Sequence, residues 1–143
     1  MINITEIEAV IQMAVAPAFL LTGIGAILTV MTMRLTRIVD RFRVLIEGKN
    51  VSIKKKDKAD ELTSLIYRAR WTHIAIFLTT LSALLVCILI AMIFIATGVS
   101  FNLDEYLIFL FIVAMTSLIL GLLSFLREVS LSKGVINIKK VSL

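Results

Sequence analysis

A row of small and hydroxyl-bearing residues near the start of the sequence has the residue types of an ion-coordinating surface. The row runs from Glu8 to Thr36 with alternating spacings of three and four residues, which place it on one side of a helix that follows a coiled-coil path. Hydroxyl oxygens can replace part of an ion's hydration shell, and a ring of Glu8 carboxylates would attract cations at a pore mouth. We call this row the threonine seam; its members are Glu8, Ala18, Thr22, Gly25, Thr29, Thr32 and Thr36, with Ile11 and Val15 completing the spacing.

The same residue types also suit dry contacts between helices. In lipid, small residues let two helix backbones approach closely. Two later stripes have the same character and favour packing: Thr72, Ala75, Thr79 and Ser82, and then Ala114, Ser117, Gly121 and Ser124. The sequence therefore leaves two interpretations of the threonine seam open, a pore lining and a packing surface.

Pro17 and Gly23 indicate a hinge in the same segment. Proline removes one backbone hydrogen bond from a helix and bends it, and glycine makes the following turn pliable. Both residues are also common in membrane helices that have no hinge, so a rigid helix is the alternative.

A set of arginines and two acids flanks the apolar stretches of the chain. We call it the basic collar: Arg34, Arg37, Asp40, Arg41, Arg43, Arg68, Arg70, Arg127 and Glu128. We expect Asp40 and Glu128 to pair with guanidinium groups in a network that joins three helix ends, and lipid phosphates to bind the surplus charge. A dedicated phosphate-ligand site is the alternative.

Catalytic sets are missing from the sequence. No span contains paired carboxylates, the single His73 and single Cys87 form no cluster, and no glycine-rich loop follows a strand. We therefore expect no enzyme, no cofactor and no bound metal.

The composition of the chain predicts a membrane protein. The chain of 143 residues is 59% hydrophobic, with a mean hydropathy of +1.02, against roughly 45–50% apolar residues in soluble domains. Three stretches without Lys, Arg, Asp or Glu, residues 9–33, 72–97 and 106–126, reach the roughly 20 apolar residues that cross a bilayer. Because lone strands cannot satisfy their backbone in lipid, these spans are predicted to be helices of one all-α membrane domain, residues 1–143.

The charges predict an orientation. All 15 Lys and Arg residues lie in the segment 34–71 or in the tail 127–143. The charged residues at the opposite ends of the three spans are all acidic. Basic loops stay in the cytoplasm, so we expect an external N-terminus and a cytoplasmic C-terminus. This sidedness explains the net charge of +5 without nucleic acid, and makes anionic lipid headgroups the expected partners.

The first two helices are predicted to extend beyond the membrane. Apolar residues continue at helical spacing after the first span and precede the second: Leu35, Ile38, Val39, Phe42, Leu45 and Ile46, and then Leu62, Leu65, Ile66 and Ala69. We expect these stripes to pack together as a cytoplasmic hairpin over residues 34–71, with Lys49 to Lys58 as its turn. Gly134 is predicted to end the third helix.

Three segments resemble a bacterial family of small membrane proteins, domain-of-unknown-function family 2721. They run from Ala16 to Ala26 (APAFLLTGIGA), from Arg34 to Arg43 (RLTRIVDRFR) and from Phe125 to Val129 (FLREV). The arginine-rich segment is the most specific of the three. The resemblance implies a bacterial three-span membrane protein and implies no activity.

Two functions follow as hypotheses. The first is a small homo-oligomeric membrane protein that forms an ion-conducting or gated pore along the first helix. The second is a structural or accessory subunit that transports nothing and binds partner proteins or anionic lipids through the basic collar. A wet seam that faces other copies favours the first, and a dry seam favours the second.

Overall fold

The structure is a computed structural model, and it describes residues 4–47, 55–99 and 104–139. These residues form three long helices, α1 (Ile4–Glu47), α2 (Lys55–Val99) and α3 (Asp104–Lys139). The described residues include no strand, which confirms the all-α class. Asn102 and most of the predicted turn, residues 49–54, lie outside the described residues.

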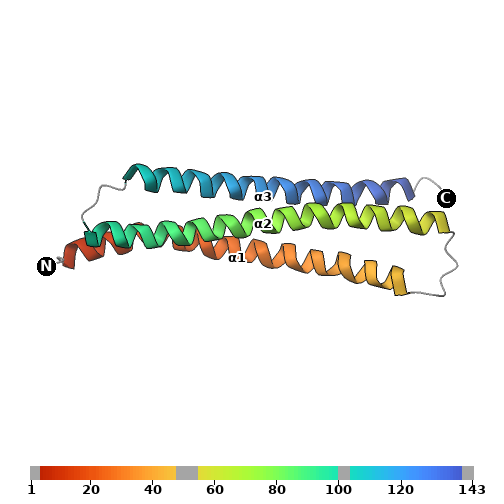
Figure 1. Ribbon diagram of the computed structural model, residues 1–143, viewed down its shortest axis with the longest axis horizontal. Helices are drawn as coiled ribbons and strands as arrows, with labels where there is room; N and C mark the ends of the chain where they lie inside the picture. Colours follow the sequence, from red (N-terminus) through yellow and green to blue (C-terminus); the bar gives the residue numbers. More distant parts are fainter. Residues whose placement is uncertain (1–3, 48–54, 100–103, 140–143) are drawn as a thin grey trace.

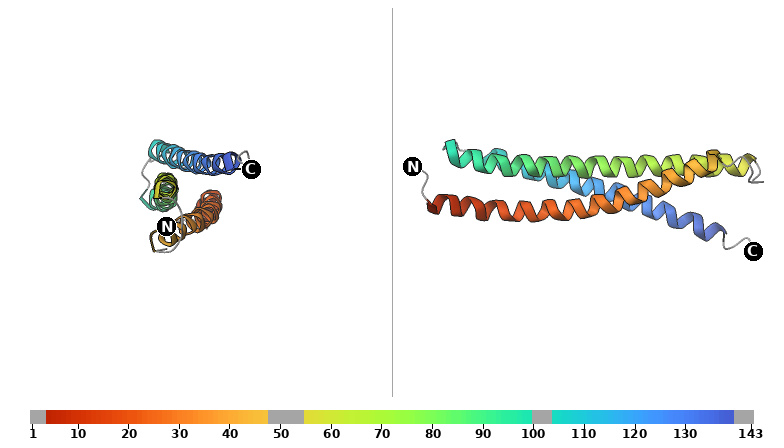
Figure 2. Two further views of the ribbon diagram at one scale, coloured as in Figure 1. Left: turned by 90° about the vertical axis from the view of Figure 1, so that its right-hand side faces the viewer. Right: turned by 90° about the horizontal axis from the view of Figure 1, so that it is seen from below.

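The helix α2 lies between the other two (Figure 1). On α1 the residues that face α2 recur every seven positions, from Val10 through half-buried Pro17 and then Ile24, Met31, Ile38 and Leu45. A seven-residue repeat keeps one side of a helix against a neighbour over many turns. This repeat explains how α1 stays packed along much of α2, and the two helices converge toward the end of α1 in the right-hand view of Figure 2.

Small residues bring α2 and α3 into close contact. A Cβ atom built on Gly121 of α3 would lie 2.6 Å from the Oγ1 of Thr79 and 3.3 Å from the carbonyl oxygen of Ala75 on α2. Ser82 donates a hydrogen bond of 2.8 Å to the carbonyl oxygen of Ala114, and Ser117 donates one of 2.8 Å to that of Leu78. The predicted packing of the small-residue stripes on the second and third helices is thereby confirmed.

All three helices contribute to the core at mid-length. Ile24 of α1 and Val86 of α2 pack with Ala114 and Leu118 of α3. Leucines and isoleucines around them, such as Leu20, are partly buried. At mid-length the bundle is thus held by an apolar core of all three helices beside the polar α2–α3 contact.

Beyond this core, α1 and α2 continue together as predicted. Ile38 and Leu45 of α1 bury against Leu65 of α2. Phe42, Leu62 and Ala69 pack around them, whereas Val39, Ile46 and Ile66 of the predicted stripes are exposed. The paired helices therefore extend past the apolar stretches, with three of the six residues of the first stripe and three of the four residues of the second in the contact.

Two predicted helix boundaries were wrong. The turn expected up to Lys58 ends earlier, since α2 begins at Lys55, because lysine, aspartate and alanine without glycine or proline do not oppose a helix. The third helix passes Gly134 and ends at Lys139, well inside the predicted tail. A single glycine costs a helix only about 1 kcal/mol relative to alanine, so it does not end one by itself.

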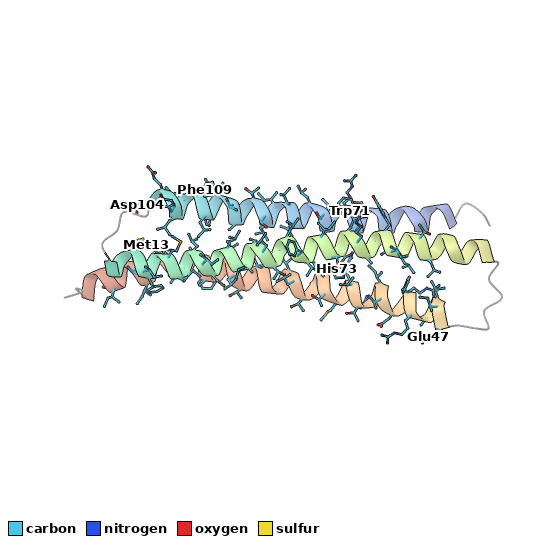
Figure 3. The ribbon with its side chains drawn as sticks, in the orientation of Figure 1. Met13, Glu47, Trp71, His73, Asp104 and Phe109 are labelled. Atoms are coloured by element: carbon cyan, nitrogen blue, oxygen red, sulfur yellow. The ribbon has the colours of Figure 1, made fainter. Side chains whose placement is uncertain are left out.

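The outer surface of the bundle is apolar. Phe19, Phe77 and Phe109 keep 74%, 67% and 68% of their surface exposed, and Phe109 lies on the outer side of α3 in Figure 3. Within the described residues, three helices are long and apolar enough to cross a membrane: Ile7–Glu47, Leu62–Ala96 and Asp104–Ser130. Such a surface is suited to lipid and not to water.

Candidate functional site

The threonine seam lies on the outside of the three-helix unit. All seven of its members are exposed, whereas the stripe from Val10 to Leu45 is buried against α2. With 3.6 residues per turn, the seam members lie about 100° or about 160° around α1 from the buried row. The packing interpretation therefore does not hold within one chain, because neither α2 nor α3 covers the seam.

The hydroxyl groups of the seam bond to their own helix. Thr22 and Thr29 donate to the carbonyl oxygens of Ala18 and Gly25, at 3.3 and 3.0 Å. Thr32 and Thr36 do the same with Leu28 and Thr32, at 2.7 and 3.1 Å. Since each hydroxyl proton is used inward, the oxygen lone pairs are what the seam presents outward. A surface of oxygen acceptors suits cations better than anions.

The predicted hinge residues lie within an unbroken helix. The helix α1 stays α-helical through Pro17 and Gly23, and it is curved in the right-hand view of Figure 2. No heavy atom of a neighbouring group lies within 4 Å of a Cβ built on Gly23 or on Gly25. The space around both glycines is therefore open in the single chain.

An ion-pair network joins the three helices at one end of the apolar region. The carboxylate of Glu128 on α3 accepts hydrogen bonds from Arg34 of α1, at 3.3 Å, and from Arg68 of α2, at 3.1 Å. Its side chain is 1% exposed, whereas the two arginines keep 41% and 26% of theirs exposed. A buried carboxylate needs partners of this kind, because an unpaired charge is costly to remove from water.

Aromatic rings contact arginines at the same end of the apolar region. The guanidinium of Arg34 lies 5.3 Å from the ring centre of Phe125, and that of Arg127 lies 4.9 Å from the ring centre of Trp71. Trp71 lies on the α3 side of α2 (Figure 3) and contacts Tyr67 edge to face, with ring centres 6.1 Å apart. Tryptophan and tyrosine prefer the membrane–water interface, so this level matches a bilayer surface.

A cavity of about 280 Å³ opens beside the network. Ile38 and Leu65 form its apolar wall. We call it the arginine pocket; its charged residues are Arg34, Arg37, Arg41, Arg68 and Glu128. The pocket therefore brings together five of the nine collar residues, from all three helices.

The remaining collar residues lie elsewhere. Arg127 stacks on Trp71, and Asp40, Arg43 and Arg70 are exposed. Among the described residues no ion pair reaches Asp40, which corrects the expectation that it pairs with the arginines. Asp40 is exposed on α1 and does not line the pocket that Arg34, Arg37 and Arg41 share. Glu128 binds the arginines of both other helices, and its position two residues after the third apolar stretch is the signal that distinguishes it.

Three apolar helices with an apolar exterior, closed at one end by a buried ion-pair network, define an integral membrane protein of the multi-pass class. The chain belongs to the family described as "Protein of unknown function (DUF2721)", whose sequence profile matches residues 14–138. The family resemblance seen in the sequence is thereby confirmed. No curated protein and no solved structure matches the chain.

Proposed function

We propose that the protein assembles as a homo-oligomer in a bacterial inner membrane and conducts ions along a path lined by the threonine seam. The observation that carries this proposal is the exposure of the whole seam on the outside of the three-helix unit. In lipid, a row of small and hydroxyl-bearing residues is typical of a surface that another helix approaches. The partner we propose is α1 of a second copy.

The helix α1 is also the least buried of the three. Of its 18 consecutive residues with the highest mean hydropathy, 11% are buried, compared with 22% for the corresponding residues of α2 and of α3. Bulky residues such as Phe19, Val30 and Met33 occupy other exposed positions of α1, where they can face lipid. An assembly through the seam would leave these residues outside and, from Ala18 to Thr36, bring only small and hydroxyl-bearing residues together.

The chemistry of the seam favours cations. Its threonine oxygens are available as acceptors, and exposed Glu8 would form an acidic ring at one mouth. The basic collar at the other mouth opposes cation entry, and Glu128 offsets part of that charge by pairing with Arg34 and Arg68. We place the acidic mouth outside and the collar in the cytoplasm, in accord with the positive-inside rule.

A second function is favoured by a different observation. The arginine pocket is a formed cavity lined by all three helices, and it suits an accessory subunit, neither enzyme nor transporter, that binds anionic lipids or partner proteins. In that case the seam is a dry contact or faces lipid. The wetness of the seam distinguishes the two functions.

Thiol modification during current recording tests the pore. In a Cys87→Ala background, Gly25→Cys and Thr29→Cys are each introduced, and a charged, water-soluble thiol reagent is added to bilayers that contain the protein. Both cysteines should react and change the current. The matched control is Val30→Cys, next to Thr29 and 53% exposed but off the seam, and it should not react.

Two results would end the pore proposal in favour of the accessory function. One is an equal reaction at residues 29 and 30, and the other is the absence of current at any voltage or membrane tension. Labelling of a cysteine at position 102 only from the cytoplasmic side would reverse the proposed orientation.

A further inference from the structure

We propose that the arginine pocket binds a phosphate group, either that of a lipid headgroup or that of a soluble phosphate compound. The inference rests on the geometry and charge of the pocket, and it does not depend on the pore. The proposed site lies beside the ion pairs through which Glu128 joins the three helices.

The charge of the lining carries the first step. Four guanidinium groups and one carboxylate line the pocket, so its residues have a formal charge of +3. Glu128 is engaged by Arg34 and Arg68, which fixes these two side chains in place. A cavity with this excess of positive charge is a site for an anion.

The positive groups of the pocket are guanidinium groups, which favour phosphate over other anions. A guanidinium group presents a planar set of donors that matches two oxygens of a phosphate at once. Arg34, Arg37 and Arg41 recur on one side of α1, and Arg68 approaches from α2, so donors converge from two helices. Since Glu128 accepts a bond from only one nitrogen of Arg34, the other donors of that guanidinium can serve a ligand.

Arg37 is the residue whose position is best explained by a ligand. It lines the pocket but is exposed, and no ion pair joins it to another residue that the structure describes. Its role in holding the helices together is therefore small. A substitution of Arg37 can test the pocket without opening the Glu128 network.

The depth and size of the cavity fit a headgroup phosphate. Arg34 follows the first apolar stretch directly, and Glu128 comes two residues after the third one ends. Trp71 and Tyr67, interfacial residues by type, lie at the same level. A cavity of about 280 Å³ is at the lower limit of small-molecule pockets, about 300 Å³, and therefore suits one phosphate with its nearest substituents.

The test is a binding titration with the full chain in a neutral detergent at fixed ionic strength. Two probes are used separately, short-chain phosphatidylglycerol and inorganic phosphate, and the midpoint of thermal unfolding is followed. A ligand that binds only the folded protein raises this midpoint and yields an apparent Kd. We expect a saturable rise with at least one probe.

The decisive comparison is between Arg37→Gln and Arg43→Gln. Both remove one positive charge from an exposed position of α1, but only Arg37 lines the pocket. Arg37→Gln should weaken the apparent Kd about 10-fold, the value of one charge-assisted hydrogen bond, and Arg43→Gln should leave it unchanged. Equal weakening in both variants would show a diffuse surface charge and overturn the proposal.

The two probes identify the source of the phosphate. A response to phosphatidylglycerol alone assigns the pocket to a lipid, a response to inorganic phosphate alone assigns it to a soluble compound, and both results support the site. No saturable response to either probe would overturn it. The pore experiment reads current and thiol reaction at the seam, so its failure and the failure of this titration are distinguishable.

Discussion

Polar residues are used in opposite ways on α1 and on the other two helices. The buried polar side chains of the described residues are Thr72, Thr79, Ser82, Ser117 and Glu128, all of them on α2 or α3. The threonines of the seam on α1 are the same kind of residue, and every one of them is exposed. Similar stripes in the sequence therefore have different structural roles.

The hydrogen bonds explain what the difference means. On α2 and α3, Ser82 and Ser117 bond across to the neighbouring helix, and this fixes how the two helices meet. On α1, Thr29 and Thr32 bond only to the carbonyl of the preceding turn, which would form in any helix. The buried serines of α2 and α3 thus specify how these two helices meet, whereas the seam threonines of α1 bond to no other helix of the described chain.

The largest effect expected from this contrast is at Glu128. Glu128→Gln removes the charge on which Arg34 and Arg68 converge, and we expect a loss of about 3 kcal/mol in unfolding free energy, the lower end for breaking a buried pair, because both arginines are partly exposed. Exposed Asp40→Asn should stay within about 0.5 kcal/mol of the wild type. Denaturant or thermal unfolding in detergent measures both, and an equal loss would show that burial does not decide the role of a collar acid.

A smaller effect is expected from adding one methyl group at a glycine. Gly121→Ala places a Cβ 3.2 Å from the backbone nitrogen of Thr79 and closer still to its hydroxyl, and overpacking of this kind costs about 1–3 kcal/mol. Gly25→Ala meets open space, and alanine favours a helix by about 1 kcal/mol over glycine, so the fold should not lose stability.

The same pair of variants sharpens the contrast when assembly is measured. Gly25→Ala should weaken self-association, seen by cross-linking or by mass photometry in detergent, if α1 helices meet through the seam. Unchanged association would argue against that contact. Gly121→Ala is the control, because it should lower the stability of the fold without changing the seam and should therefore leave self-association through the seam unchanged.

The smallest effect is expected from single hydroxyl groups. Ser82→Ala removes a buried bond of 2.8 Å and leaves a carbonyl oxygen of α3 without this donor, which should cost about 1 kcal/mol. Thr29→Ser keeps a hydroxyl at an exposed position and should change unfolding by less than about 0.5 kcal/mol. A loss at Thr29 as large as that at Ser82 would mean that the seam does support the fold of the single chain.

Most of the fold follows from the sequence because lipid allows few solutions. Three apolar stretches without charges predict three helices, and the apolar spacing beyond residue 34 predicts the paired extension that Ile38, Leu45 and Leu65 form. Helix ends were less predictable, since the effects of Lys55 to Lys58 and of Gly134 are each small beside the packing of a long helix. Local signals of about 1 kcal/mol do not decide such boundaries.

The site was harder to predict for a different reason. Two rows on α1 have the same repeat, the threonine seam and the stripe of Ile24 and Met31, and periodicity cannot say which of them a neighbour covers. In the basic collar, Asp40 is closer in sequence to several arginines than Glu128 is, yet the neighbours that matter come from other helices. Spacing along one helix identifies shared sides, and contacts between helices need the structure.

The seven-residue repeat of α1 continues without interruption from the apolar core at Ile24 to the extension at Leu45. It follows that the seam and the arginine pocket share one angular register. Deleting a single residue between Met31 and Arg34 would turn everything beyond it by about 100° around the helix axis. Arg34 would then leave Glu128, and Arg37 and Arg41 would leave the pocket, while nearly the whole seam kept its direction. The number of residues in that short junction is therefore as constrained as their identity.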